Sequence, residues 1–273
     1  MSWLEFSDDT YRSEPRSIPL RARLCPSLSL YLPFLRIVLH ANRCARQKRF
    51  DDDQLCRSTL ACFRLLERLG IAIEVTGINH IRDLNSSCVI IANHMSALET
   101  VVLPIIIHPF RPLTFIVKQS LLTYPVFGPI MRALNPVAVS RTHPRQDLKK
   151  VLEEGSDRVR QGLSIVVFPQ TTRTTSFDPS RFTSLGVKLA HRAGVPVVPL
   201  ALKTDAWGNG KYLKDFGPVD PSKEVRFAFG PPMTVQKRGA EEQQATVDFI
   251  QQCLQEWSTA PQAGAVSPCA PQG

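Results

Sequence analysis

His94 and Glu99, separated by four residues, have the types and spacing that acid–base chemistry requires. A neutral imidazole can take a proton from a hydroxyl near neutral pH. A carboxylate bonded to the other ring nitrogen fixes the tautomer and stabilises the imidazolium that forms. A second interpretation needs no chemistry, because Ser96 followed three residues later by Glu99 also matches a helix capping box. These residues alone leave both interpretations open.

The elements around this pair are predicted by the pattern of apolar residues. The run at residues 87–92 predicts a buried strand of a parallel sheet, and residues 98–107 predict a helix. His94 therefore lies where a strand ends, at the edge of open α/β sheets that binds ligands. The alternation continues, with expected strands at residues 71–76, 113–117, 136–140, 163–168, 195–202 and 224–229, and expected helices at residues 55–69, 125–134, 145–161, 184–193 and 241–257. This alternation predicts an α/β fold with a central, mostly parallel sheet flanked by helices.

Cations follow three other predicted strands. Lys118 comes after the strand at residues 113–117, Arg141 after 136–140, and Arg173 shortly after 163–168. Phosphate recognition needs permanent charge with donors, which arginine supplies as a fork and lysine as a point charge. Taken singly, each could instead be a solvated boundary residue, and Arg173 could serve a surface ion pair that contributes at most about 1 kcal/mol.

Four segments with these side chains follow one another at predicted strand ends. They are His94 with Glu99; Phe115-Ile-Val-Lys118, which continues through Tyr124-Pro-Val-Phe-Gly128 to Arg141; Phe168-Pro-Gln-Thr-Thr-Arg173; and Val195-Pro-Val-Val-Pro199. In this order they resemble the four motif blocks of the glycerolipid acyltransferases, the 1-acylglycerol-3-phosphate (lysophosphatidic acid) acyltransferase family. A single block is a weak signal, whereas four in order are specific. The resemblance covers residues from about 77 to 229.

The resemblance implies an O-acyltransferase that acts in phospholipid biosynthesis. Members move a fatty acyl chain from acyl-CoA or acyl carrier protein to the free hydroxyl of a lysophospholipid, first of all 1-acylglycerol-3-phosphate to give phosphatidic acid. They need no metal or other cofactor. By position, His94 matches the catalytic base and Glu99 its acidic partner. Lys118 and Arg173 match the cations that bind the acceptor phosphate, and Arg141 is a supporting cation of the second block.

The sequence departs from the family pattern at three positions. Glu99 stands where most members have aspartate, and the extra methylene must be absorbed by the rotamer or the backbone. In the third block, Gln170 and Thr171 replace the usual glutamate and glycine, and we expect both to line the substrate site. Gln170 either keeps the same hydrogen bonds or leaves the pocket more positive and suited to a different acceptor. Thr171 is costly at positive φ, so the turn itself could differ.

These departures keep other functions open. The acceptor could be another lysolipid, such as a lyso-ornithine lipid, lysophosphatidylcholine or a glycolipid. The chain could also be a non-catalytic lipid-binding relative, or a thioesterase that uses water as the acceptor. A serine hydrolase is disfavoured, because the chain has no Gly-x-Ser-x-Gly elbow.

The amino-acid composition limits the classes of partner that the chain can bind. The 273 residues carry a formal net charge of +9, which implies an anionic partner. Aromatic residues do not alternate with the basic ones and no zinc-finger spacing occurs, which favours an anionic membrane surface over nucleic acid. Seven cysteines without a Cys-x-x-Cys motif indicate reduced thiols. We therefore expect a peripheral membrane protein on the cytoplasmic face.

Three regions are expected along the chain: residues 1–50 as an N-terminal arm and interfacial segment, 51–258 as the acyltransferase domain, and 259–273 as a disordered tail. Residues 1–23 are polar and are expected to lie over the surface or to be disordered. Residues 24–40 are apolar but interrupted by Pro33 and Arg36, so they are too short to span a bilayer. With the basic residues that follow, this segment predicts either a helix in the headgroup region or one packed on the core. The loop at residues 206–211 is either a flap over the acceptor or a plain surface loop.

Overall fold

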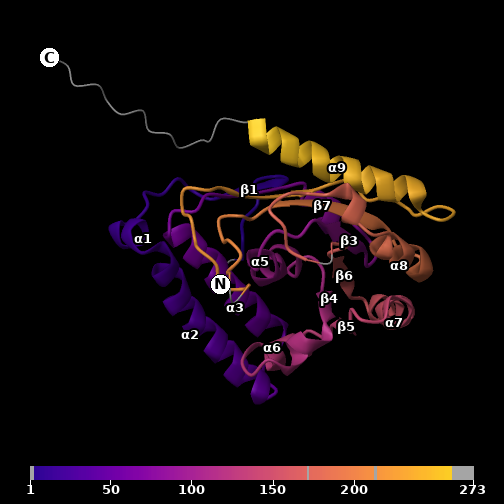
Figure 1. The fold of residues 1–273 in the computed structure, drawn as a ribbon, viewed down its shortest axis with the longest axis horizontal. Coiled ribbons are helices and arrows are strands. Elements are labelled where there is room, and N and C mark those ends of the chain that lie inside the picture. The colour runs from indigo at the N-terminus through magenta and orange to yellow at the C-terminus, as the bar shows by residue number, and fades with distance from the viewer. Residues whose placement is uncertain (1–2, 171, 212–213, 260–273) are drawn as a thin grey trace.

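The computed structural model describes residues 3–170, 172–211 and 214–259, so the predicted tail beyond residue 259 lies outside the described residues. Its centre is an eight-stranded sheet of order β1-β2-β8-β7-β3-β6-β4-β5 (Figure 1). The strands are β1 (Thr10–Arg12), β2 (Ile73–Thr76), β3 (Val89–Ala92), β4 (Leu113–Lys118), β5 (Val137–Val139), β6 (Ser164–Val167), β7 (Val197–Lys203) and β8 (Val225–Phe229). Only the β1–β2 and β7–β8 pairings among them are antiparallel, which confirms the mostly parallel α/β fold.

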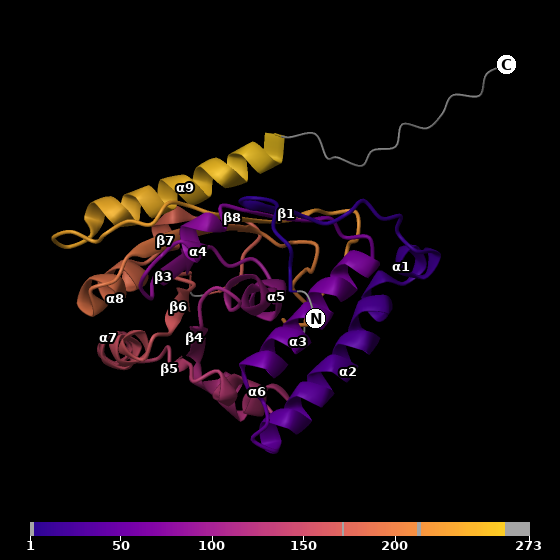
Figure 2. The ribbon, with the colours of Figure 1, turned by 180° about the vertical axis from the view of Figure 1, so that it is seen from behind.

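Helices cover both faces of this sheet. They are α1 (Leu20–Leu24), α2 (Pro26–Arg46), α3 (Asp52–Arg68), α4 (Asn79–Arg82), α5 (Leu98–Ile107), α6 (Phe127–Ala133), α7 (Pro144–Arg160), α8 (Leu185–Ala193) and α9 (Ala240–Thr259), with short 3-10 turns at Gln119–Thr123 and Pro179–Arg181. The apolar residues of α2, α3 and α5 share one core cluster, and those of α7, α8 and α9 share another. Figure 2 shows α9 along one side of the sheet and α2 and α3 on the other.

The strand that precedes His94 lies in the middle of the sheet. β3 consists of Val89, Ile90, Ile91 and Ala92, all fully buried, and it pairs in parallel with β6 and β7. A strand buried on both faces requires such an uninterrupted apolar run. β4 pairs with β6 and then with β5, also in parallel. The carboxyl ends of β7, β3, β6, β4 and β5 therefore lie side by side, and the loops that follow them share one edge of the sheet.

The prediction of a disordered or surface-lying arm at residues 1–23 is wrong at the edge strand β1 and at the buried side chains of Leu4, Tyr11 and Ala22. Residues Thr10–Arg12 form the edge strand β1, and Tyr11 is buried with its hydroxyl donating to the buried carboxylate of Glu67. Asp9 accepts a hydrogen bond from the backbone N–H of Asn79. The segment is held by pairing with β2 and by single buried side chains, neither of which produces a periodic pattern in the sequence.

Of the two predictions for residues 24–40, packing on the core is confirmed for one face of α2, and the position in a headgroup region stays a prediction. One face of the helix buries Leu30, Phe34 and Val38 in the core that it shares with α3. The opposite face exposes large apolar side chains that continue a row begun on α1: Leu20, Leu24, Leu28, Leu32, Leu35 and Leu39. Among the described residues, no helix is long and apolar enough to cross a membrane.

Candidate active site

Glu99 lies against the imidazole of His94, with 2.5 Å between its Oε2 and Nδ1 of the ring. β3 places His94 in the loop at its carboxyl end, and the first turn of α5 carries Glu99. The carboxylate is fully buried, whereas the His94 side chain keeps 12% of its surface exposed. Because Nδ1 faces the carboxylate, a proton on Nδ1 leaves Nε2 as the unprotonated nitrogen that can accept a proton.

The second oxygen of Glu99 fixes the carboxylate in place. Oε1 accepts hydrogen bonds from the backbone N–H of Met95 at 2.7 Å and of Ser96 at 3.0 Å, and from the Thr204 hydroxyl at 2.6 Å. Ser96 Oγ in turn accepts from the backbone N–H of Leu98. Glu99 therefore holds the backbone before α5 and contacts His94 at once, so the capping and catalytic interpretations of this motif do not exclude each other.

Thr204 is a site residue that the sequence analysis missed. It follows β7 directly, is fully buried, and reaches Glu99 across the sheet from 105 residues away. The available signal was its place, since it is a polar residue after a buried strand that ends at the same edge as the His94 strand. Asn93 makes a second link to β7, because its amide both donates to the carbonyl and accepts from the N–H of Leu202.

The residues of the third motif lie directly beside His94. The Phe168 ring stacks on the imidazole with centroids 4.2 Å apart, and Gln170 Oε1 accepts the backbone N–H of His94 at 2.8 Å. Gln170 is buried and its Nε2 donates to the Thr174 hydroxyl. Gln170 thus positions the His94 loop through an amide that accepts and donates at once. Thr171, which we expected to line the substrate site, lies outside the described residues.

Backbone N–H groups at the start of a helix can stabilise the oxyanion of an acyl-transfer reaction, but three of those after His94 already have acceptors within the protein. Those of Met95 and Ser96 donate to Glu99, and that of Leu98 donates to Ser96 Oγ. These three donors are committed to holding the carboxylate and its loop.

Cations lie along the same edge of the sheet as His94. Lys118 is the exposed last residue of β4, opposite Val139 of β5 in the register. Arg141 lies just beyond β5, and Arg173 lies in the loop after β6. Removal from water, together with the charge of Arg173, lowers the pKa of Arg141, so the two guanidinium groups are near enough to repel each other. Such an arrangement suits a multiply charged anion.

A turn held by Asp147 presents Arg141. Arg141 has the left-handed φ of 66°, which is unfavourable for a residue other than glycine. The carboxylate of Asp147, in the first turn of α7, accepts the backbone N–H groups of Ser140 at 2.8 Å and of Arg141 at 2.7 Å. Desolvation of Asp147 is outweighed by these hydrogen bonds, which lower its pKa. Asp147 was not among the site residues predicted from the sequence.

The loop after β7 also reaches the site. Trp207 is buried, and Asn209 Nδ2 donates to the carbonyl of Met95 at 2.8 Å. Further along, Asp215 forms an ion pair with Arg173, with 2.5 Å between Oδ1 and Nη1. The region at residues 206–211 is therefore not a plain surface loop, because it packs against the residue that follows His94.

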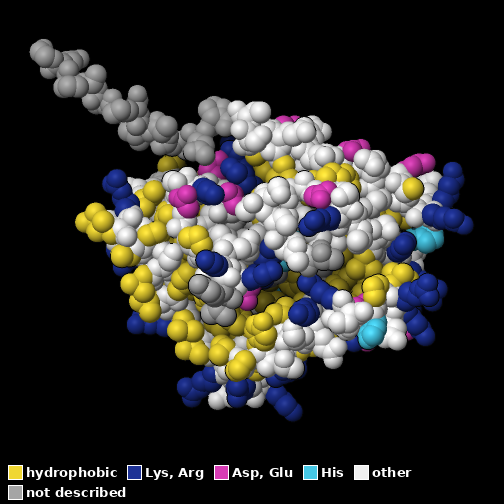
Figure 3. Space-filling model, viewed as in Figure 1, with side chains coloured by type: hydrophobic (Ala, Val, Ile, Leu, Met, Phe, Trp, Pro, Cys, Tyr) yellow, Lys and Arg dark blue, Asp and Glu magenta, His cyan; other side chains and the backbone are white. Residues whose placement is uncertain are grey.

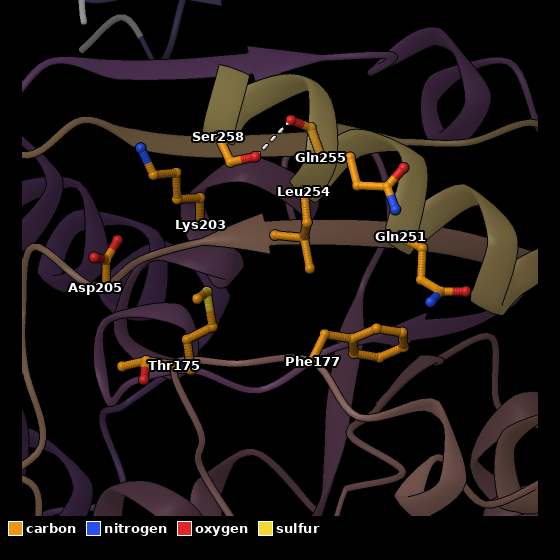
Figure 4. A pocket seen from close by; sticks show the side chains of 9 residues that line it. Thr175, Phe177, Lys203, Asp205, Gln251, Leu254, Gln255 and Ser258 are labelled. Atoms are coloured by element: carbon orange, nitrogen blue, oxygen red, sulfur yellow. Dashed lines mark hydrogen bonds between the residues drawn. The ribbon is translucent and has the colours of Figure 1, made fainter. Parts of the chain in front are cut away.

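A cavity of about 360 Å³ lies on the α9 side of Met95 (Figure 4). Its walls come from the loop after β6, the end of β7 and helix α9: Met95, Thr175, Phe177, Lys203, Asp205, Gln251, Leu254, Gln255 and Ser258. None of the predicted site residues that the structure describes lines it. Figure 3 shows a different hollow, in which apolar side chains lie between groups of lysine and arginine side chains.

Comparison with known proteins agrees with this fold and with the predicted family. A family model described as Acyltransferase matches residues 72–203. The 1-acyl-sn-glycerol-3-phosphate acyltransferase of Pseudomonas aeruginosa is 30% identical over 191 residues, which are 70% of this chain and 70% of that protein. A probable 1-acyl-sn-glycerol-3-phosphate acyltransferase of Mycoplasma pneumoniae is 33% identical over 136 residues, which are 48% of this chain and 49% of that protein.

A solved structure shares the fold. The 1-acyl-sn-glycerophosphate (LPA) acyltransferase PlsC of Thermotoga maritima superimposes with a TM-score of 0.68 at 18% identity, over 87% of this chain and 97% of that chain. An α/β sheet with a histidine–carboxylate pair and cations at its carboxyl edge, together with the family match, defines an acyltransferase. The chain belongs to the 1-acyl-sn-glycerol-3-phosphate acyltransferase family, as the resemblance of its four motifs predicted.

Proposed function

We propose that the protein transfers a fatty acyl chain from acyl-CoA or acyl carrier protein to the free hydroxyl of 1-acylglycerol-3-phosphate, giving phosphatidic acid. The observation that carries this proposal is the hydrogen bond between the buried Glu99 carboxylate and Nδ1 of His94. This pair lies at the same edge of the sheet as three cations, Lys118, Arg141 and Arg173. The pair supplies a base, and the cations supply a place for the acceptor phosphate.

In this reaction one proton is transferred twice, first from the acceptor hydroxyl to His94 and then from His94 to the leaving thiolate. Nε2 of His94 takes the proton of the acceptor hydroxyl as its oxygen attacks the thioester carbonyl. The new ester forms when the carbon–sulfur bond breaks, and the imidazolium returns the proton to the leaving thiolate. Glu99 stabilises the imidazolium between these steps. No step requires a metal or a prosthetic group.

We propose that Arg173 and Lys118 bind the acceptor phosphate, with Arg141 as a supporting cation. A matched pair of acceptors tests this: 1-acylglycerol-3-phosphate and the 1-acylglycerol that lacks the phosphate, each in vesicles with labelled acyl-CoA or acyl carrier protein. We expect the phosphate-bearing acceptor to have a kcat/KM at least about 100-fold higher, and Arg173→Ala to reduce that ratio about 10-fold through KM. Equal use of both acceptors would contradict the proposal.

We propose that the protein docks on an anionic membrane surface, on the cytoplasmic face, through the exposed leucine row of α1 and α2. The row follows one face of the helices, and Figure 3 shows apolar side chains on the side of the molecule where α1 and α2 lie in Figure 1. Arg43, Arg46 and Arg49 are exposed at the end of α2 and just beyond it. Apolar side chains beside basic ones suit the headgroup region of an anionic leaflet.

Vesicle sedimentation tests the docking surface. The triple variant Leu28→Ser, Leu32→Ser and Leu35→Ser should weaken binding to anionic vesicles by at least about 10-fold, because each leucine loses roughly 1 kcal/mol of apolar transfer. The matched control is Leu254→Ser, at a half-buried leucine of α9 on another side of the molecule. This variant should bind the vesicles as the wild type does. Unchanged sedimentation of the triple variant would refute docking through this row.

A further inference from the structure

Asp215 holds the guanidinium that the proposed function assigns to the acceptor phosphate. Its Oδ1 lies 2.5 Å from Nη1 of Arg173, and the Arg173 side chain keeps only 18% of its surface exposed. A carboxylate and a phosphate oxygen both seek the donors of an arginine fork. An acceptor phosphate that reaches Arg173 therefore meets a negative charge already bound there.

The segment that carries Asp215 is fixed beside the site. The indole Nε1 of buried Trp207 donates to the carbonyl of Asp215 at 3.1 Å. Asn209 of the same segment donates to Met95, the residue after His94. Within this segment the backbone at Gly217 lies close to that at Gly208, since a Cβ on Gly217 would lie 2.1 Å from the carbonyl oxygen of Gly208. Asp215 is thus attached directly beside its arginine.

Helix α2 holds the far side of this segment. The Tyr31 hydroxyl donates to the carbonyl of Gly217 at 2.5 Å, and its ring packs on Phe216 with centroids 5.3 Å apart. Ser27 Oγ accepts the backbone N–H of Val219. With anchors on both sides, the carboxylate has a high effective concentration at Arg173, as any tethered competitor has. A ligand must outcompete it rather than fill an empty site.

We propose that Asp215 is a tethered competitor for the acceptor phosphate at Arg173 and sets the affinity of this site for anionic acceptors. Every phosphate that binds Arg173 must first displace the carboxylate. Asp215 therefore lowers the affinity for all phosphate-bearing acceptors by the same factor, and it does not change the affinity for an acceptor without a phosphate. This inference depends on the proposed role of Arg173.

The test measures KM and kcat for 1-acylglycerol-3-phosphate and for 1-acylglycerol, which lacks the phosphate, with the wild type and Asp215→Asn. We expect Asp215→Asn to lower KM for the phosphate-bearing acceptor about 3-fold and to leave KM for 1-acylglycerol unchanged, with little change in kcat. Asp215→Ser should behave in the same way, and Asp215→Glu should keep the wild-type KM. Asp220→Asn, an exposed carboxylate of the following turn, is the matched control.

A double-variant cycle assigns the effect to Arg173. If Asp215 acts by competing for this guanidinium, Asp215→Asn changes neither KM in the Arg173→Ala background. A KM that rises in Asp215→Asn, as it should in Arg173→Ala, would show that Asp215 positions the arginine and would overturn the proposal. An unchanged KM for 1-acylglycerol-3-phosphate in Asp215→Asn and Asp215→Ser would overturn it as well. If Arg173→Ala leaves KM for the monoester unchanged, the phosphate site itself is misassigned, which is a separate failure.

Discussion

The histidine pair and the cations beside it are built in different ways. Glu99 is fully buried, and its carboxylate forms one hydrogen bond with each of four residues: His94, Met95, Ser96 and Thr204. Its position is therefore fixed by redundant contacts. Lys118 is exposed, and Arg173 is held by a carboxylate from a distant loop. The proposed reaction centre is thus held by several contacts, whereas the proposed binding side has charges that a ligand can rearrange. Substitutions at the His94–Glu99 pair should change kcat, and substitutions at the cations should change KM.

Among the substitutions that distinguish the His94–Glu99 pair from the cations, Glu99→Gln should have the largest effect on the kinetics. An amide can donate to Nδ1, which favours the wrong tautomer, and it cannot stabilise the imidazolium. We expect kcat to fall at least about 100-fold with acceptor KM nearly unchanged. Glu99→Asp, which keeps the charge one methylene shorter, should lose less. A Glu99→Gln enzyme with normal kcat and raised KM would break the comparison.

Arg141→Ala should show the opposite signature. Removing a cation that repels Arg173 and faces the same edge should raise acceptor KM roughly 10-fold and leave kcat within about 3-fold. Lys149→Ala is the control, because Lys149 is an exposed cation on α7 whose partner is Glu153. Steady-state kinetics at several acceptor concentrations separate the two parameters. A fall in kcat alone would place Arg141 in the reaction centre instead.

Thr204→Val should give the smallest of these effects. The hydroxyl is one of three donors to Glu99 Oε1, so its loss leaves the two backbone donors in place. We expect kcat to fall about 3- to 10-fold and the free energy of unfolding to fall by about 1–2 kcal/mol. Thr100→Val on α5, whose hydroxyl donates only to the carbonyl of Ala97, is the control. A loss as large as that of Glu99→Gln would show that the contacts are not redundant.

The sequence predicted the parts of this comparison that depend on neighbouring residues. The apolar run of β3, the helix after it and the placing of His94 and Glu99 in one turn follow from local periodicity and spacing. The place of each cation at the carboxyl edge of the sheet follows from its position after a predicted strand, but the order of the cations along that edge depends on the strand order. The family was likewise identified from short motifs, although the roles of the individual residues stay predictions.

The partners that arrive from elsewhere in the chain could not be predicted. Thr204 lies 105 residues from Glu99, and Asp215 lies 42 residues from Arg173. No periodicity links residues so far apart, because strand order and loop packing decide which of them meet. Strand β1 was missed for the same reason, since three residues that pair at a sheet edge carry too little pattern.

The most direct test of the central claim is the initial rate of phosphatidic acid formation by His94→Ala, measured on the same anionic vesicles as the wild type. With no ring nitrogen to take the hydroxyl proton, the rate should fall at least about 100-fold, while thermal unfolding and vesicle binding stay as in the wild type. A folded, vesicle-bound His94→Ala protein that still transfers acyl groups at the wild-type rate would contradict the account.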